Sequence, residues 1–438
     1  MPLLTEAEAR KILEKVLSYS KSEECEANLN GNFGGNIRYA RNTVTTSGAT
    51  NDTTLVVQST YGKKSGVATI NEFDDASLEK VVRRSEELAR LAPENPEYVG
   101  MLGPQTYLTS KAYFETTAKI SPDYRAQAAV DSIKPAREKN LIAAGFLQDS
   151  AGFQSMMNTK GLFAYHTQTG VNFSVTVRTE DGTGSGYVTR DYNDVSKLST
   201  GAASQVAIDK AIKSQQPKAI EPGKYTVILE PAASIDLLQN MIFNMDARQA
   251  DEGRSFLAKA GGGTKLGEKI VDERVTIYSD PTHPDIATAT WGQDGRPQEK
   301  TYWIEKGVVK NLFYSRFWAQ QKGVKAVPAP ANGVMEGGTA TIDEMIKSTA
   351  KGILVTRTWY IRTVDPQTLL YTGLTRDGLY YIENGQIKFP IKNFRFNESP
   401  VIMLNNIEAL GKPERINGNL IPPMKLRDFT FTSLSDAV

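Results

Sequence analysis

Helix-like and strand-like segments occur in separate blocks along this 438-residue chain. Residues 36–70 and 141–190 consist mostly of strand-like runs separated by short turns. Residues 6–18, 78–91 and 121–139 instead show the apolar spacing of amphipathic helices. A parallel α/β sheet needs a regular alternation of strand and helix, which this order does not provide. The pattern therefore predicts the α+β class.

A segment with two prolines and a glycine divides the chain near its middle. Residues 214–223, SQQPKAIEPG, show little apolar periodicity, which is typical of a linker. We therefore predict an N-terminal αβ domain at 1–213, a sheet with flanking helices, and a strand-rich, barrel-like C-terminal domain at 224–438. Within the second domain, apolar spacing predicts a helix at 234–247, and a Thr-x-x-Glu capping pattern predicts another at 341–349.

The charge balance argues against a nucleic-acid-binding protein. The chain has 51 Lys and Arg residues against 50 Asp and Glu residues, without a basic stripe, whereas phosphate binding needs an excess of positive charge. Its single cysteine, Cys25, excludes an intramolecular disulfide and fits a reducing compartment. The charged N-terminus is unlike a signal peptide, and no run approaches the roughly 18 apolar residues of a membrane span. We therefore expect a soluble, cytoplasmic protein with neither nucleic-acid nor membrane partners.

Few residues of the chain are typical of catalytic or metal sites. Its two histidines, His166 and His283, are far apart in the sequence and have no metal-ligand spacing. His166 lies in an alternating run that predicts an ordinary strand side chain, and His283 is expected in a polar loop. Cys25 follows the first predicted helix and is expected to be a small, at least partly buried residue. The sequence contains no phosphate-binding loop or dinucleotide motif.

Several longer segments point to one family. Residues 227–253 read as a strand and a short loop leading into a helix, and residues 294–323 as an extended pair of strands. Residues 355–387 contain Thr-Gly-Leu-Thr-Arg-Asp-Gly and Ile-Glu-Asn-Gly, and Lys-Asn-Phe-Arg-Phe-Asn-Glu-Ser-Pro follows at 392–400. In these segments, and over about residues 5–430, the chain resembles the TldD/PmbA family, also called peptidase family U62. Members of this family have been named modulators of DNA gyrase.

The resemblance implies a metal site whose ligands are replaced in this chain. In catalytic TldD-type subunits, the helix of the first segment carries His-Glu-x-x-x-His, and a C-terminal cysteine supplies a third zinc ligand. The matching positions here are Gln239, Asn240 and Asn244, and no cysteine follows Cys25. Neutral amide oxygens are poor zinc ligands, and Asn240 cannot act as a general base. The resemblance therefore implies a TldE/PmbA-like, non-catalytic chain with a degenerate metal site and no metal.

The same three positions also have a structural interpretation. Positions 239 and 244 are five residues apart, about 140° around an ideal helix, so a shared metal needs a widened turn or a position at the helix end. Without a metal, the segment is a plain amphipathic helix whose amides face solvent or a cleft. We favour this interpretation over a substrate-binding role for Gln239 and Asn244.

The motif at 372–378 has two interpretations. It can present backbone groups to an extended peptide that lies against a strand edge, which is a common mode of peptide binding. Alternatively, its Gly and Asp residues form a tight turn in which Arg376 pairs with Asp377 or another acid. Both interpretations stay open. The candidate peptide-binding residues are Thr372, Gly373, Thr375, Arg376 and Asp377.

Three functional hypotheses follow. The first is a TldE/PmbA-like, metal-free subunit of a TldD/TldE-type heterodimeric metalloprotease that acts on unfolded or extended peptides. The resemblance implies that a TldD-like partner supplies zinc and hydrolysis. The second is a homodimeric peptide-binding or scaffold protein without proteolytic activity. The third is an active peptidase with a different metal site, the weakest hypothesis because acidic groups of this kind are usually solvated helix faces. Its ligands would be Asp246, Asp251, Glu252 and His166.

Overall fold

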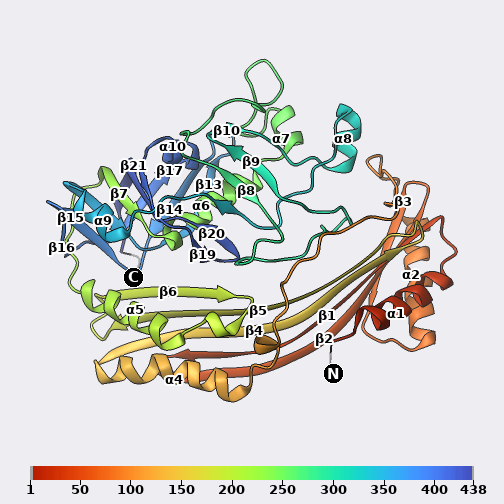
Figure 1. The fold of residues 1–438 in the computed structure, drawn as a ribbon, viewed down its shortest axis with the longest axis horizontal. Coiled ribbons are helices and arrows are strands. Elements are labelled where there is room, and N and C mark those ends of the chain that lie inside the picture. The colour runs from red at the N-terminus through yellow and green to blue at the C-terminus, as the bar shows by residue number, and fades with distance from the viewer. Residues whose placement is uncertain (1–2, 437–438) are drawn as a thin grey trace.

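The first half of the chain folds into one large antiparallel sheet (Figure 1). The computed structural model describes residues 3–436, and in this part of the chain six strands form the sheet. They are β1 (Glu24–Ala40), β2 (Thr43–Tyr61), β3 (Lys64–Ile70), β4 (Leu141–Asn158), β5 (Phe163–Thr179) and β6 (Ser185–Tyr192). Their order is β3-β2-β1-β4-β5-β6, and every neighbouring pair is antiparallel.

Helices cover one face of this sheet. They are α1 (Glu6–Tyr19), α2 (Asp75–Leu91), α4 (Pro122–Glu138) and α5 (Thr200–Lys213), with the short α3 (Glu115–Ala118) and the 3₁₀ helix η1 (Val195–Lys197) in the connections. The first two lie at one end of the sheet, and α4 and α5 lie at the other (Figure 1). Successive strand residues point to opposite faces, so Leu29 packs with the first helix pair and Phe173 with the second.

The helix starts follow the sequence pattern closely. Helix α1 begins at Glu6, as predicted, after a capping box of Thr5 and Glu8, and the side chain of Asp74 caps α2. A proline inside a helix can bend or break it, but α4 contains Pro135 and continues past it to Glu138. Helix breaking at this proline is therefore excluded.

Strand β1 begins earlier than the sequence predicts. It starts at Glu24, whereas the strand pattern was recognised only from residue 36, because several glycines interrupt the segment between them. A Cβ atom on Gly31 would lie 2.2 Å from the ring of Phe153, and one on Gly35 would lie 2.3 Å from the guanidinium of Arg125. The glycines therefore make room for side chains that cross the strand.

The second half of the chain forms two further sheets. Among the described residues, nine strands form the larger sheet: β7 (Gly223–Leu229), β12 (Lys351–Val355), β13 (Thr358–Asp365), β14 (Leu370–Thr375), β15 (Leu379–Glu383), β16 (Gln386–Pro390), β17 (Phe394–Glu398), β18 (Ile407–Leu410) and β21 (Met424–Leu434). The smaller sheet contains β8 (Ile277–Ser279), β9 (Thr301–Glu305), β10 (Val308–Val309), β11 (Val334–Met335), β19 (Glu414–Ile416) and β20 (Asn419–Ile421). The larger sheet runs β13-β14-β17-β21-β7-β12-β15-β16, so β13 and β16 are its edges.

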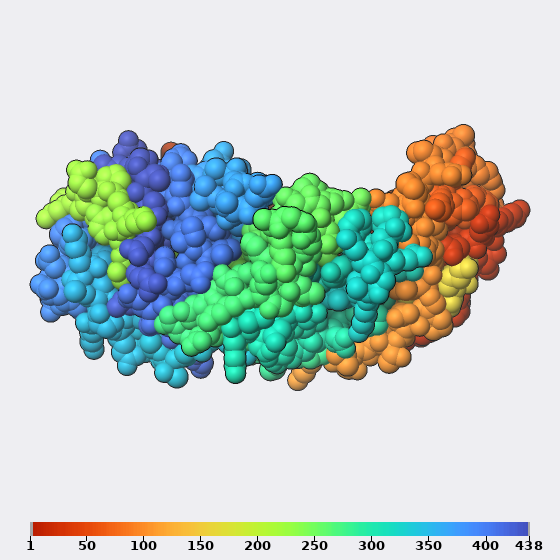
Figure 2. All heavy atoms as spheres, turned by 90° about the horizontal axis from the view of Figure 1, so that it is seen from above, coloured from red at the N-terminus to blue at the C-terminus, as the bar shows by residue number. Residues whose placement is uncertain are grey.

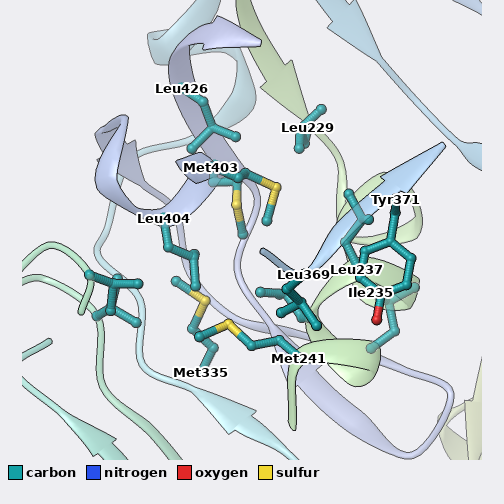
Figure 3. Packing of buried hydrophobic residues seen from close by; sticks show 14 of the residues in the cluster. Leu229, Ile235, Leu237, Met241, Met335, Leu369, Tyr371, Met403, Leu404 and Leu426 are labelled. Carbon is teal, nitrogen blue, oxygen red and sulfur yellow. The ribbon is translucent and has the colours of Figure 1, made fainter. Parts of the chain in front are cut away.

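The second half contains five helices among the described residues, and the apolar side of one of them, α6, packs into the main apolar core. The helices are α6 (Pro231–Phe243), α7 (Ala247–Asp251), α8 (Arg316–Lys322), α9 (Ile342–Lys347) and α10 (Pro400–Asn405). Ile235, Leu237 and Met241 of α6 belong to the largest buried cluster, and Figure 3 shows Met241 beside Met335. Burial of several such side chains, at about 1.5–3 kcal/mol each, fixes the helix in place. The helix predicted at 341–349 is confirmed as α9, which begins with a capping box at Thr341.

The two halves face each other across the uncovered side of the first sheet (Figure 1). Arg415 of β19 forms an ion pair of 2.9 Å with Asp191 of β6. In the connection between α2 and α3, the hydroxyl of Tyr107 donates a 2.7 Å hydrogen bond to the carbonyl oxygen of Gly295. The end of the first sheet that carries α1 and α2 projects beyond the second half, so the molecule is elongated (Figure 2). A small buried apolar cluster also joins the halves, in which Trp291 packs with Met156 and Leu162.

The predicted α+β class is confirmed, with helices flanking the first sheet and a strand-rich second half. The last helix of the first half, α5, ends at Lys213, and the first strand of the second half begins at Gly223. Division into two domains at 214–223 stays a prediction. Across residues 3–436, the helices are too short or too polar to cross a lipid bilayer.

Candidate functional site

Helix α6 carries the three positions that were predicted as a degenerate metal site. It begins at Pro231, in the first helical position, and ends at Phe243, so the predicted range of 234–247 is wrong at both ends. Gln239 and Asn240 lie in its last turn, and Asn244 is the residue that caps its C-terminus. The spacing argument required one of the two positions, 239 or 244, to lie at a helix end if they were to share a metal. Asn244 lies at such an end.

The side chains of Asn240 and Asn244 are turned back onto the helix. The amide nitrogen Nδ2 of Asn240 donates a 2.8 Å hydrogen bond to the carbonyl oxygen of Asp236. Nδ2 of Asn244 donates to the carbonyl oxygen of Asn240 at 2.7 Å and lies 3.4 Å from the hydroxyl of Tyr371. Both acceptors are carbonyls of α6 itself, and that of Asn240 also accepts a 3.2 Å hydrogen bond from the backbone N–H of Asn244. The amide nitrogens of both side chains are therefore bonded to the helix backbone.

This set of side chains does not fit a zinc ion. Gln239, Asn240 and Asn244 offer only neutral amide oxygens, and two of the three amides are already bonded to the helix backbone. Zinc sites in enzymes use imidazole, thiolate or carboxylate at three protein positions. In the part of the chain that the structure describes, no group of three or more His, Cys, Asp or Glu residues is arranged to hold a metal ion.

The alternative metal site of the third hypothesis is not formed either. Asp246 caps α7 by accepting a hydrogen bond from the backbone of Gln249. Asp251 accepts a 2.8 Å hydrogen bond from the indole of Trp318. Glu252 pairs with Arg248 at 2.9 Å, and His166 lies in β5 of the first sheet. The structure therefore does not bring these four residues together, and each acid has a structural partner.

The other titratable residues that the sequence singled out have structural positions. Cys25 is fully buried under α1 and α2, and burial raises the pKa of its thiol. His283 lies in a loop, where its Nδ1 accepts a 3.2 Å hydrogen bond from the backbone of Asp285. His166 is buried in β5, and burial lowers the pKa of its imidazole. The interpretation of His283 as a loop residue and of His166 as a strand residue is confirmed.

Gln239 stands between two cavities. Both contain the side chains of Gln239 and Phe243. The first, of about 180 Å³, lies between the halves and reaches Gln168 of β5 and Asn332. The second, of about 420 Å³, is a groove along the polar side of α6, which we call the α6 groove. It is lined by Asp236, Gln239, Asn240, Phe243, Trp359, Tyr360, Ile361 and Arg362.

The first sheet presents a polar, weakly charged face towards these cavities. Two adjacent rows across β2, β1, β4 and β5 contain Thr54, Asn30, Gln154 and His166, and then Asp52, Asn32, Gly152 and Gln168. A third cavity of about 480 Å³ lies on these rows and shares Gln168 with the cavity between the halves. Asp52 is the single charged residue of the two rows, whereas solvated surfaces usually mix many charges.

The three cavities are neighbours, since Gln168 lines two of them and Gln239 lines two. We call them together the amide cleft, because Asn30, Gln154, Gln168, Gln239 and Asn240 line them. A carboxamide group donates and accepts hydrogen bonds, as a peptide unit does. Because such groups carry no net charge, they can hydrogen-bond an extended main chain of almost any sequence. The cleft is therefore chemically suited to binding a neutral polar polymer such as a peptide backbone.

Sequence reasoning missed the contribution of the first sheet to this cleft. A signal was present, because Asn28, Asn30 and Asn32 alternate along one strand and must share one face. That pattern was hidden by the glycines of the same segment. Gln168 had no such signal, since its approach to Gln239 depends on how the two halves meet.

The motif at 372–378 lies inside the larger sheet. Thr372 pairs with Arg362 of β13 on one side and with Asn397 of β17 on the other. The strand edge that we expected a peptide to use is therefore occupied on both sides. A Cβ atom on Gly373 would lie 2.5 Å from the ring of Phe396, which explains the glycine by packing. Peptide binding through the side chains of this motif stays a prediction.

Two residues of this motif are fully buried. The hydroxyl of Thr375 accepts a 2.8 Å hydrogen bond from the backbone of Phe394. Asp377, with a positive φ of 58°, accepts hydrogen bonds of 2.6 Å from Ser185 of β6 and from Arg357. Arg376 was expected to pair with Asp377 or another acid, and it lies 3.9 Å from Asp377, whereas Arg357 lies closer, at 2.6 Å. The turn therefore joins the two halves of the molecule.

Comparison with family models identifies this arrangement. PmbA/TldA metallopeptidase domain 1 matches residues 25–89, the central domain of the same family matches 115–215, and its C-terminal domain matches 222–433. The chain belongs to the PmbA/TldD family. The resemblance found in the sequence is therefore confirmed, and it extends over both halves of the fold.

Named proteins are similar to this chain, one in sequence and two in fold. The metalloprotease PmbA of Escherichia coli O157:H7 is 20% identical over 465 aligned residues, which cover 97% of this chain and 98% of that protein. The structure of TldE from Thermococcus kodakarensis has a TM-score of 0.87 at 17% identity, covering 97% of this chain and 99% of the other. A protein from Thermotoga maritima named as a modulator of a DNA gyrase gives the same score and identity, covering 97% and 100%.

Proposed function

We propose that this chain is a TldE/PmbA-like subunit that binds extended peptides in the amide cleft and leaves their hydrolysis to a TldD-like partner. The partner supplies zinc, the general base and the third ligand. This chain supplies one wall of the space in which the peptide lies. The cytoplasm, where Cys25 stays reduced, is the proposed location of the complex.

The observation that carries this proposal is the chemistry of α6. The PmbA/TldD fold is retained around the helix, with its apolar side in the main core. Its polar side carries Gln239 and Asn240 where catalytic relatives carry a zinc ligand and a base. A fold that keeps the helix and its groove but replaces these residues supports binding without hydrolysis.

The polar face of the first sheet supports a peptide ligand. Side chains such as Asn30, Gln154 and Gln168 offer hydrogen bonds without charge. An unfolded peptide has unpaired N–H and C=O groups along its whole length, whereas a folded protein has most of them paired. The cleft therefore favours extended chains over folded ones, and it discriminates little between side chains.

Exposed aromatic residues beside the cleft support a second protein chain. Phe243 is 58% exposed, Trp359 is 42% exposed and Tyr360 is 58% exposed, all along the α6 groove. Such residues are enriched in protein interfaces, because large rings gain much from desolvation. The groove would then be closed by the partner, which places the partner's reactive groups next to α6.

Metal content and peptide hydrolysis test this proposal together. The purified chain is measured for zinc by mass spectrometry and assayed against an unstructured fluorogenic peptide. The same assay is repeated after mixing with the TldD-like protein from the same cells, and with that protein alone. We expect no stoichiometric zinc in this chain, no cleavage by it, and cleavage by the mixture that exceeds that of the partner alone.

Two other outcomes lead to the alternative hypotheses. If the chain alone forms a stable dimer and the TldD-like protein neither binds it nor gains activity, the homodimeric binding or scaffold function replaces the proposal. If the chain alone retains zinc and cleaves the peptide, the assignment of a non-catalytic role is wrong.

A further inference from the structure

The outer side of strand β2 is covered by β3 only in part. β3 pairs with β2 from Leu55 to Tyr61, at the end of the sheet beside α2 (Figure 1). On its inner side, β2 pairs with β1 along almost its whole length. Among the described residues, no strand therefore pairs with the outer side of β2 before Leu55.

A β-bulge limits this unpaired segment at its other end. Arg38 of β1 pairs with Thr46, but the next residue, Tyr39, pairs with Val44, so Thr45 is an extra residue in β2. Such a bulge bends its strand and disrupts regular pairing. The regular part of the segment is therefore residues 46–54, Thr-Ser-Gly-Ala-Thr-Asn-Asp-Thr-Thr, which we call the free edge. Its first seven residues are all exposed.

The free edge lacks the features that usually prevent pairing with another chain. Proteins protect their sheet edges with lysine, proline, bulges or very short strands. In the larger sheet, the edge strand β13 has two irregularities in its pairing, and the edge strand β16 contains Lys388 and Pro390. The free edge contains no Lys, Arg or Pro, and its one charged residue is Asp52. Its outward N–H and C=O groups are therefore open to a further strand.

The free edge is complementary to itself. Two copies that pair antiparallel about an axis perpendicular to the sheet share both of its faces, so opposite residues must be an even number of positions apart in the sequence. Nine residues meet this condition, and full overlap places Thr50 opposite Thr50 of the copy. Asp52 then lies opposite Gly48, so the two carboxylates do not meet, and Thr46 lies opposite Thr54. Threonine pairs of this kind stabilise sheets.

The ends of the free edge agree with this overlap. One step further, Thr45 would lie opposite Leu55 of the copy, whose outer side is already paired with Ile70. The bulge turns β2 at Thr45, the residue at which pairing must stop. Nine opposite pairs give about eight to ten main-chain hydrogen bonds, which is the number in a typical protein interface. An unrelated extended peptide has no such match in length.

We propose that the free edge pairs with the free edge of a second copy of this chain, antiparallel, with Thr50 of each copy at the two-fold axis. The six strands of each copy then form one continuous sheet. The third cavity of the amide cleft reaches the free edge through Asp52 and Thr54, so the clefts of both copies lie on that sheet. The α6 groove belongs to the second half and stays available to a TldD-like partner. This inference does not depend on the proposed function.

Cysteine cross-linking tests the register directly. Cys25, the natural cysteine of the chain, is fully buried, so the wild type should stay unlinked. After oxidation, we expect Thr50→Cys, or the double variant Ala49→Cys with Asn51→Cys, to give a disulfide-linked dimer on a non-reducing gel. Opposite pairs alternate between a close and a wide spacing along an antiparallel ladder, so one of these two variants has the geometry that a disulfide needs.

Thr46→Cys is the matched control, because it places a cysteine at another exposed threonine of the free edge. In the proposed register, position 46 of one copy is eight residues away from position 46 of the other, about 27 Å along the strands. A disulfide cannot span this distance. The control should therefore stay unlinked under the same oxidation.

A charge at the axis should weaken the dimer. Thr50→Lys places two ammonium groups opposite each other, whereas Thr43→Lys adds the same charge to β2 beyond the bulge. Sedimentation velocity measures the dissociation constant of the dimer, and circular dichroism melting checks that both variants fold. We expect about tenfold weaker association for Thr50→Lys and no change for Thr43→Lys.

Several results would overturn this inference. One is a wild-type chain that stays monomeric at the highest concentration at which it is soluble. Another is equal cross-linking of Thr46→Cys and Thr50→Cys, because the copies then meet in no fixed register. If the TldD-like protein or an extended peptide prevents the Thr50→Cys cross-link, the free edge receives that molecule instead. None of these results changes the zinc content or peptide cleavage that test the proposed function.

Discussion

The hydroxyl of Ser185 donates a 2.6 Å hydrogen bond to the carboxylate of Asp377, which lies 192 residues further along the chain. The second oxygen of the same carboxylate accepts a 2.6 Å hydrogen bond from Arg357. Asp377 is only 1% exposed, so these partners replace the water that an ionised carboxylate otherwise needs. The side chain of Asp377 thus joins the start of β6 in the first sheet to the second half.

Replacing Asp377 is expected to destabilise the protein strongly. Asp377→Ala leaves Arg357, whose side chain is 15% exposed, without its main counter-charge, which should cost about 3 kcal/mol of unfolding free energy. Urea unfolding followed by tryptophan fluorescence measures the loss. Asp377→Asn is the matched control, because asparagine tolerates the positive φ and still accepts from Ser185; it should cost less. An unchanged midpoint for the alanine variant contradicts the role of this contact.

Adding one methyl group to Gly373 is expected to disturb the larger sheet. Its Cβ atom would lie 2.5 Å from the ring of Phe396 and 3.2 Å from Ile361, so Gly373→Ala should cost about 1–3 kcal/mol by overpacking. Gly201→Ala in α5 has no neighbour within 4 Å of the new atom and should cost nothing. Thermal melting compares the two. Equal melting temperatures for the two variants would show that the ring of Phe396 moves aside without a loss of stability.

The stability of the chain should depend on His166 in mildly acidic solution. Burial lowers the pKa of this histidine below its ordinary value of 6.5. The unfolded chain therefore binds a proton at a pH where the folded chain does not, and the contribution of His166 to stability is lost as the pH falls from 6.5 through its folded pKa. His166→Gln should flatten this part of the stability curve.

The chain has only two histidines, so His283→Gln is a direct control for this experiment. Urea midpoints are compared for the three proteins between neutral pH and pH 5. A slope that is the same in wild type and His166→Gln means that carboxyl groups, rather than this imidazole, set the acid sensitivity.

Restoring imidazoles to α6 is expected to give only weak metal binding. Gln239→His with Asn244→His recreates two ligands, one on the last turn and one at the helix end. Stable zinc sites use at least three protein ligands, so most of the metal should leave on dialysis, as measured by mass spectrometry. Gln239→His alone is the control. One zinc retained per double variant reveals a third ligand in the cleft that we have not recognised.

Gln168 is expected to contribute to peptide affinity without affecting stability. It lines two of the three cavities, so Gln168→Ala removes a hydrogen-bonding group from the middle of the amide cleft. A loss of about 1 kcal/mol corresponds to roughly fivefold weaker binding of a neutral extended peptide. Gln205→Ala, on the exposed side of α5, is the control. If Gln168→Ala and Gln205→Ala bind the peptide with equal affinity, the peptide does not contact the first sheet at Gln168.

The parts of the fold that the sequence predicted well are those set by local chemistry. The capping boxes at Thr5 and Thr341 bring two hydrogen-bonding groups together within four residues, and their helices begin where expected. The start of β1 was missed because Gly31 and Gly35 have low strand propensity. Their selection depends on Phe153 and Arg125, which lie far away in the sequence.

The candidate site was predictable only on one of its sides. Gln239, Asn240 and Asn244 were found through the family resemblance, and the end-of-helix position of Asn244 agrees with the spacing argument. Gln168 was not found, because its approach to Gln239 depends on contacts between the two halves. We also expected the 372–378 motif to present a free strand edge to a peptide. That edge is occupied, because β14 pairs with β13 on one side and with β17 on the other, and the order of strands in a sheet cannot be read from the motif alone.

The ties between the halves also bear on how a peptide enters. Asp377 joins them at one place, and the ion pair of Arg415 with Asp191 joins them at another. Tyr107 adds a third contact, to Gly295, and all such contacts oppose a motion in which the halves open around a substrate. We expect the gate to be the docking of another chain, which covers or exposes the opening as it arrives or leaves. The rate at which peptide enters should then depend on the concentration of that chain, and not on the rate of a hinge motion between the halves.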